Sequence, residues 1–111
     1  MEWTEKKISE IVVVSVNGRL DGATSPVFDQ GLQILLNAGE HKIVFDITQL
    51  EYISSAGLRV FLNTAKKVQK SGKVVLFGIK PHIREVLSIA GFDTIFSIAE
   101  SEEDAIAVFQ N

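Results

Sequence analysis

Cysteine is absent from the chain, which excludes disulfide bridges, thiolate chemistry and zinc sites built on cysteine. Histidine is scarce, because His41 and His82 are the only two and neither lies in a spaced cluster of His, Asp and Glu. No apolar run reaches the ~18 residues of a membrane-spanning helix, and the first residues are not those of a signal peptide. We therefore expect a cytoplasmic protein that binds no metal, needs no cofactor and does not insert directly into a membrane.

An excess of positive charge is also absent, since 14 Asp and Glu residues outnumber 11 Lys and Arg residues, for a net charge of −3. Four lysines form a local group within residues 66–73, whereas a nucleic-acid-binding protein usually carries a basic stripe over a whole face. Composition therefore argues against nucleic acid as a partner. The apolar fraction of 46% is typical of a globular protein, and residues 1–111 have the length of one domain, which we expect to be monomeric.

Strands and helices should alternate along the chain. Apolar and β-branched segments predict five strands, at residues 3–8, 11–16, 42–47, 73–79 and 94–97. Apolar residues at helical spacing predict four helices, one capped by Ser25 and ended by Gly39, and others over residues 55–71, from Pro81 to Gly91 and from Ser101 onwards. Residues 48–53 are expected to form a loop.

Strands that alternate with helices imply right-handed crossovers between parallel strands. The predicted fold class is therefore an α/β sandwich with a mixed sheet of four to five strands and about four helices. In that sheet the first pair of strands is antiparallel and the later strands are parallel.

Two loops should lie at the carboxyl ends of strands, where ligands and modifications gather in such sheets. They comprise residues 18–24 and residues 46–57. Ser55 lies at the predicted start of a helix, where backbone N–H groups lack partners within the helix and the dipole is positive. Those amides can hold a phosphate on Ser55, and the small Ala56 and Gly57 would let another protein's active site approach.

Each of these residues also has a purely structural interpretation. Ser54 or Ser55 can cap the helix, which is worth ~1 kcal/mol. Asp21 can be a turn residue, or its charge can lie beside the Ser55 loop and orient the serine or a partner's cation. A phosphoserine adds roughly −1.5 to −2 charge, and beside Asp21, Asp46 and Glu51 it would weaken a docking surface.

Residues 52–58, which read YISSAGL, resemble the signature of STAS domains, the fold of anti-sigma-factor antagonists and of the cytoplasmic tails of sulphate transporters. The family pattern there is an apolar pair followed by Asp-Ser-small-Gly-Leu. Residues 18–21, which read GRLD, resemble the family's second signature, Gly-x-Leu-Asp. Element order and length also match, so the resemblance covers essentially the whole chain.

The resemblance implies a partner-switching protein. It makes Ser55 the phosphoacceptor and Asp21 the aspartate of the second signature. Ser54 stands where most phosphorylated members have Asp, so Ser54 is a rival acceptor. The implied partners are an anti-sigma factor that is also a serine kinase, and a PP2C-type phosphatase that resets the switch. The residues expected to bind the partner are Asp21, Gly22, Thr24, Ser54, Ala56, Gly57, Leu58 and Arg59.

The sequence also bears on two other classes of function. A STAS domain that docks constitutively in a transporter or lipid-transport complex would need no phosphorylation, and Ser54 in place of Asp motivates that alternative. An enzyme is not expected, because the chain has neither a Gly-x-Ser-x-Gly elbow nor a Gly-rich phosphate loop. A receiver domain phosphorylated on Asp46 would need an acidic pair at the end of an early strand, where this chain has valines.

Overall fold

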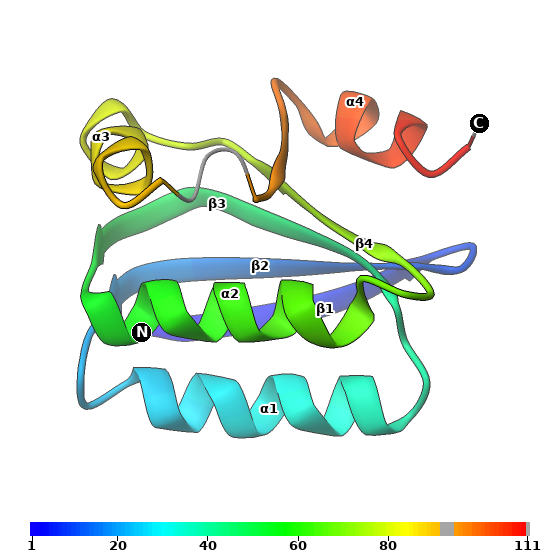
Figure 1. Cartoon of the computed structure of the whole chain (residues 1–111), viewed down its shortest axis with the longest axis horizontal. Helices are drawn as coiled ribbons and strands as arrows, with labels where there is room; N and C mark the ends of the chain where they lie inside the picture. Colours follow the sequence, from blue (N-terminus) through cyan, green and yellow to red (C-terminus); the bar gives the residue numbers. More distant parts are fainter. Residues whose placement is uncertain (92–94, 111) are drawn as a thin grey trace.

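The computed structural model describes residues 1–91 and 95–110, which form one five-stranded sheet and four helices (Figure 1). The sheet has the strand order β1-β2-β3-β4-β5, with β1 antiparallel to β2 and every later neighbour parallel. The strands are β1 Glu2–Ile8, β2 Ile11–Leu20, β3 Lys42–Ile53, β4 Lys73–Phe77 and β5 Ser97–Ala99. The helices are α1 Ser25–Asn37, α2 Ser55–Val68, α3 Pro81–Ile89 and α4 Glu102–Ala107. The predicted fold class is therefore confirmed.

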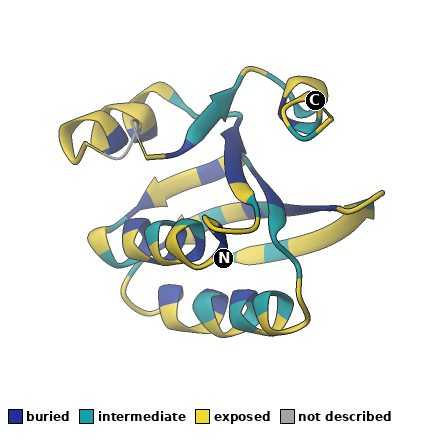
Figure 2. Cartoon of the chain, turned by 45° about the vertical axis from the view of Figure 1, so that its right-hand side comes forward, coloured by how far each residue is buried: buried dark blue, intermediate teal, exposed yellow. Residues whose placement is uncertain are grey.

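Both faces of the sheet are covered, which explains why β2 begins as an almost unbroken apolar run. Successive side chains of a strand point to opposite faces. Val12 and Val14 pack in a large cluster with α1, α2 and α3, whereas Ile11 and Val13 pack in a smaller cluster with Ala105 of α4. The outer side of α1 remains exposed (Figure 2).

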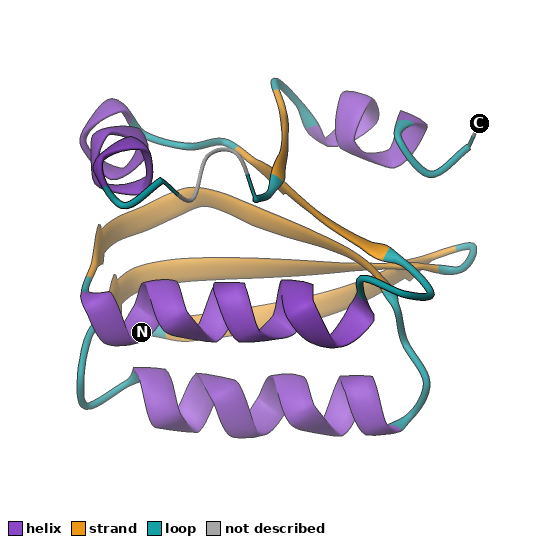
Figure 3. Cartoon of the chain, viewed as in Figure 1, coloured by secondary structure: helices purple, strands orange, loops and turns teal. Residues whose placement is uncertain are grey.

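Three phenylalanines hold α1 and α2 together on the sheet. Phe28 of α1, Phe45 of β3 and Phe61 of α2 contact one another edge to face, with ring centroids 4.7–6.2 Å apart. Such pairs add ~0.5–1.5 kcal/mol each beyond the burial of their area. Because α1 follows β2 and α2 follows β3, the two helices run side by side and begin at the same end of the sheet (Figure 3).

The expected loop at residues 48–53 is wrong, because this segment continues β3 as far as Ile53. The strand β2 also extends past residue 16 to Leu20, and it pairs with β3 through Gly18↔Leu50 and Leu20↔Ile53. Register shifts between Ser15 and Asn17 and between Gly18 and Arg19 interrupt the alternation of buried and exposed residues. That interruption hides the strand from a pattern with a period of two.

Several predicted boundaries shift by a few residues. The strand β4 ends at Phe77 rather than at residue 79, because Gly78 has φ +77° and leaves the extended conformation. The helix α2 ends at Val68 rather than at residue 71, and α3 ends at Ile89. The predicted strand at 94–97 begins outside the described residues, and the observed strand β5 starts at Ser97.

Candidate functional site

The carboxyl ends of β2 and β3 bring the two predicted loops together. The backbone N–H of Ser54 donates to the Leu20 carbonyl oxygen at 2.9 Å, directly before Asp21. This bond continues the parallel pairing of Leu20 with Ile53 into the start of α2. The segment 21–24 and the first turn of α2 therefore lie side by side at one end of the sheet (Figure 1).

The two neighbouring serines have different environments. Ser54 is the N-cap of α2, with an extended backbone and an Oγ that accepts from the Gly57 N–H at 3.3 Å. Its carbonyl oxygen accepts the first helical bond from Leu58. Ser55 is the first residue of the helix and is exposed. The cap is therefore provided by Ser54, and the side chain of Ser55 projects from the positive end of the helix dipole.

Gly57 and Leu58 lie beneath the surface. A Cβ on Gly57 would be 2.8 Å from the Ile53 side chain and 3.0 Å from the Leu20 carbonyl oxygen, so only glycine lets α2 start this close to β2. Leu58 is 6% exposed and packs in the large cluster. These two residues hold the Ser55 segment in position, whereas Arg59 is exposed beside it.

Asp21 orders the segment before α1. Its Oδ1 accepts from the backbone N–H groups of Ala23 and Thr24, both at 3.0 Å, and from the Thr24 hydroxyl. The Thr24 hydroxyl also lies 2.9 Å from the Arg19 carbonyl oxygen, to which it can donate. Thr24 is the N-cap residue of α1 and makes no side-chain cap bond. The prediction that Ser25 is the cap is wrong, because Ser25 is the first residue of the helix and is buried.

The hydrogen bonds to Asp21 lower the pKa of its carboxyl group, with the Thr24 N–H as the largest cause and the Thr24 hydroxyl next. A folded pKa below the unfolded value means that Asp21 stabilises the fold above the unfolded pKa of ~3.9. That contribution is lost as the pH falls through the lower folded pKa.

We therefore expect Asp21→Asn to lower the free energy of unfolding at pH 7 and to have progressively less effect below pH ~4. Urea unfolding of the native chain and the variant over this pH range measures the difference. Glu85→Gln, on the exposed side of α3, is the control for loss of one negative charge. A native-minus-variant difference that stays constant with pH would contradict the role of the charged carboxylate.

A groove of about 160 Å³ lies between the N-terminal parts of α1 and α2. Its lining includes Pro26 and Asp29 of α1 and Ala56, Arg59 and Asn63 of α2. Because Ala56 directly follows Ser55 and Arg59 lies about one turn later on the same helix, the groove continues the surface around Ser55.

A family model described as the STAS domain matches residues 2–105. The chain belongs to the STAS domain family. It is 40% identical over 111 residues to BtrV, a candidate anti-sigma factor antagonist of Bordetella bronchiseptica, with 99% of this chain and 96% of that protein covered.

Two solved structures show the same fold as this STAS domain. A candidate anti-sigma factor antagonist from Thermotoga maritima is 24% identical, has a TM-score of 0.94, and is matched over 98% of this chain and 95% of that one. The phosphorylated form of the Bacillus cell fate determinant SpoIIAA is 21% identical, has a TM-score of 0.76, and is matched over 97% and 99%.

An exposed pair in the STAS domain lies beside the site and was missed in the sequence. The guanidinium of Arg19 stacks 4.2 Å from the ring centroid of Tyr52, and the two residues are partners in the extended pairing of β2 with β3. Next to them, His82 of α3 contacts the Glu51 carbonyl oxygen at 2.8 Å. The signal was available in the GRLD and YISSAGL segments, but only a strand through residues 48–53 pairs Arg19 with Tyr52.

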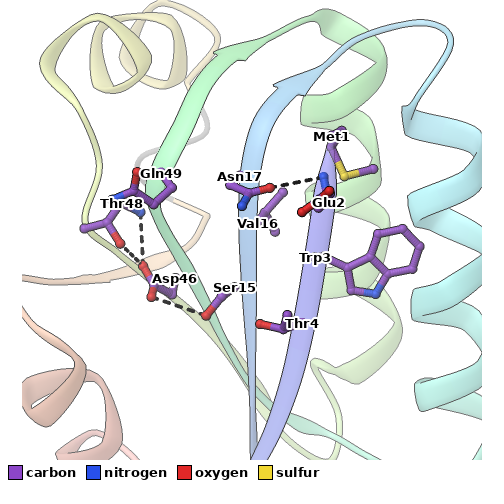
Figure 4. A pocket seen from close by; sticks show the side chains of 10 residues that line it. All are labelled: Met1, Glu2, Trp3, Thr4, Ser15, Val16, Asn17, Asp46, Thr48 and Gln49. Atoms are coloured by element: carbon purple, nitrogen blue, oxygen red, sulfur yellow. Dashed lines mark hydrogen bonds between the residues drawn. The ribbon is translucent and has the colours of Figure 1, made fainter.

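Asp46 does not belong to the Ser55 surface, although both were expected in one loop. It projects from the sheet face opposite α2, where its Oδ2 accepts from the Ser15 hydroxyl at 3.3 Å and its Oδ1 accepts from the Thr48 N–H at 3.1 Å. These residues line a hollow of about 460 Å³ beside the start of β1 and the middle of β2 and β3 (Figure 4). Asp46 is therefore used to hold the β3 backbone at its register shift.

Residues 1–91 and 95–110 contain neither a metal-binding cluster nor a membrane-spanning helix. No group of three His, Asp or Glu side chains in this part of the STAS domain could hold a metal ion. None of the helices described here combines the length and apolar character needed to cross a membrane.

Proposed function

We propose that this STAS domain is a cytoplasmic, monomeric anti-sigma factor antagonist controlled by phosphorylation of Ser55. It binds an anti-sigma factor that is also a serine kinase while Ser55 is unmodified, which frees a sigma factor for transcription. Phosphorylation of Ser55 releases the antagonist, and a PP2C-type phosphatase resets it. The observation that carries the proposal is the exposed Ser55 at the first position of α2, next to a separate capping serine.

The local charges support a switch at Ser55. The N–H groups at the start of α2 that Ser54 does not cap favour an anion, so a phosphate on Ser55 can be accommodated without distorting the helix. Toward a partner, the same phosphate adds negative charge to an end of the sheet that already carries Asp21 and Glu51. A partner surface that fits the unmodified domain would then meet repulsion and an uncompensated loss of hydration.

The partner surface comprises the exposed residues around Ser55. Gly22 and Arg59 are exposed, and Asp21, Thr24, Ser54 and Ala56 are partly exposed beside them. Gly57 and Leu58 support this surface from below. The Arg19–Tyr52 pair extends it on the side of α3.

Incubation with ATP and an anti-sigma serine kinase, followed by intact-protein mass and fragmentation, tests the proposal. We expect one added phosphate on Ser55, none in Ser55→Ala, and unchanged modification of Ser55 in Ser54→Ala. A phosphate on Ser54 would contradict the assignment of the acceptor. Absence of phosphate on the native domain in the presence of kinases that modify other antagonists would contradict the switch.

The second candidate function is constitutive docking in a transporter or lipid-transport complex. The observation that favours it is Ser54, which takes the place of the family's acidic residue and is used as the helix cap. Under this function the domain would copurify with a transporter, and Ser55→Glu would leave that association unchanged. Loss of the association in Ser55→Glu would exclude it.

A further inference from the structure

We infer that Arg59 binds the phosphate of phosphorylated Ser55 within the same helix, and that this contact withdraws Arg59 from the partner-binding surface. The inference rests on the proposed modification of Ser55. It adds a second effect to phosphorylation, because the phosphate then removes a cation from the surface as well as adding an anion.

The position of Arg59 on α2 supports this contact. Residues 55 and 59 are separated by four positions on a helix that runs from Ser55 to Val68, so they lie on one face about one turn apart. Side chains of a helix lean toward its N-terminus, which directs Arg59 back toward Ser55. Both residues are exposed to solvent.

Arg59 is available for a new partner. Within residues 1–91 and 95–110 the guanidinium takes part in no ion pair or hydrogen bond. Asp29 lines the same groove from α1 but accepts from Gln33 at 3.3 Å and forms no ion pair with Arg59 there. A phosphate presents three oxygens and up to two charges, and a guanidinium can bind two of those oxygens at once. Phosphorylated Ser55 is therefore the stronger of the two acceptors for Arg59.

The contact changes what a partner meets at this surface. With Ser55 unmodified, the five N–H donors of Arg59 face solvent and can bind a carboxylate of the partner. With Ser55 phosphorylated, the same donors face the phosphate. The groove between α1 and α2 then has Asp29 without a neighbouring free cation among the residues that line it.

The test uses a genetically encoded phosphoserine at position 55, so that it needs no kinase. A ³¹P NMR titration gives the second pKa of the phosphate in the native background and in Arg59→Gln, Arg59→Lys and Lys66→Gln. Lys66 is exposed on α2 about 16 Å from residue 55 along the helix axis, and its replacement matches the loss of one positive charge. The neighbouring charged groups Arg19, Asp21, Asp29 and Glu51 are present in every variant.

We expect Arg59→Gln to raise the second phosphate pKa by about 0.4 unit, since the lost pair no longer favours the dianion. Arg59→Lys should give a smaller rise, because lysine keeps the charge without the fork, and Lys66→Gln should give less than about 0.1 unit. An unchanged pKa in Arg59→Gln, or equal rises in Arg59→Gln and Lys66→Gln, would overturn the contact. Either result leaves the phosphorylation of Ser55 to be judged by the kinase experiment.

Discussion

Phosphoserine at position 55 should lower the affinity for the anti-sigma factor at least about a hundredfold, which corresponds to ~2.8 kcal/mol of binding free energy. The phosphate would lie at the centre of the proposed surface, between the Asp21 segment and the groove of α1 and α2. Each oxygen that the partner cannot match must lose its water on docking, and the added charge repels acidic groups of the partner. Calorimetric titration of the encoded phosphoserine protein against the anti-sigma factor measures the loss.

Two variants separate the effect of position from that of charge alone. Phosphoserine at Ser71, an exposed residue just beyond the far end of α2, should leave the affinity almost unchanged. Ser55→Asp should reduce the affinity less than phosphoserine does, because one carboxylate carries less charge than a phosphate. Binding of the Ser55 phosphoprotein as tight as that of the unmodified domain would disprove the proposed release.

Gly72→Ala should lower the free energy of unfolding by about 3 kcal/mol, at the upper end of the usual cost of overpacking. A Cβ at this position would be 1.8 Å from the His41 carbonyl oxygen, which is backbone and cannot turn aside. The same oxygen accepts from the Lys73 N–H at 3.0 Å, directly before β3 and β4 pair. Relief of the clash would therefore separate the beginnings of two central strands. Urea unfolding measures the change.

Gly22→Ala is the matched control for this substitution. A Cβ on Gly22 would meet nothing within 4 Å, and the residue has no positive φ. We expect its free energy of unfolding to change by less than about 0.5 kcal/mol. A Gly72→Ala protein as stable as the native chain would contradict the close approach of β4 to His41.

The sequence predicted the architecture because its strongest signals, the strand and helix patterns, are local. Valine-rich segments form strands and apolar residues at helical spacing form helices, and their alternation permits few topologies. The start of α2 at Ser55 was predicted correctly for the same reason. Strand lengths were not, because the register shifts of β2 against β3 arise from pairing between segments about 30 residues apart.

The environments of individual site residues were harder to predict. Either Ser54 or Ser55 could cap α2, and only the backbone conformation assigns the cap to Ser54. Ser25 has the sequence of a cap before Pro26, but the Asp21–Thr24 turn starts α1 one residue earlier and buries Ser25. Asp46 shares a sequence segment with Ser55, yet the alternation of β3 directs it to the other face of the sheet.

The assignment of the helix cap to Ser54 has a consequence for how a signal could be stored. Since the side chain of residue 55 is not used to build the helix, adding or removing a group there need not be coupled to folding. The lifetime of each state would then depend on the turnover of the enzymes that add and remove the phosphate. A small domain of this kind can pass through many cycles of modification without unfolding, because its two states differ only in the group bound to one hydroxyl oxygen.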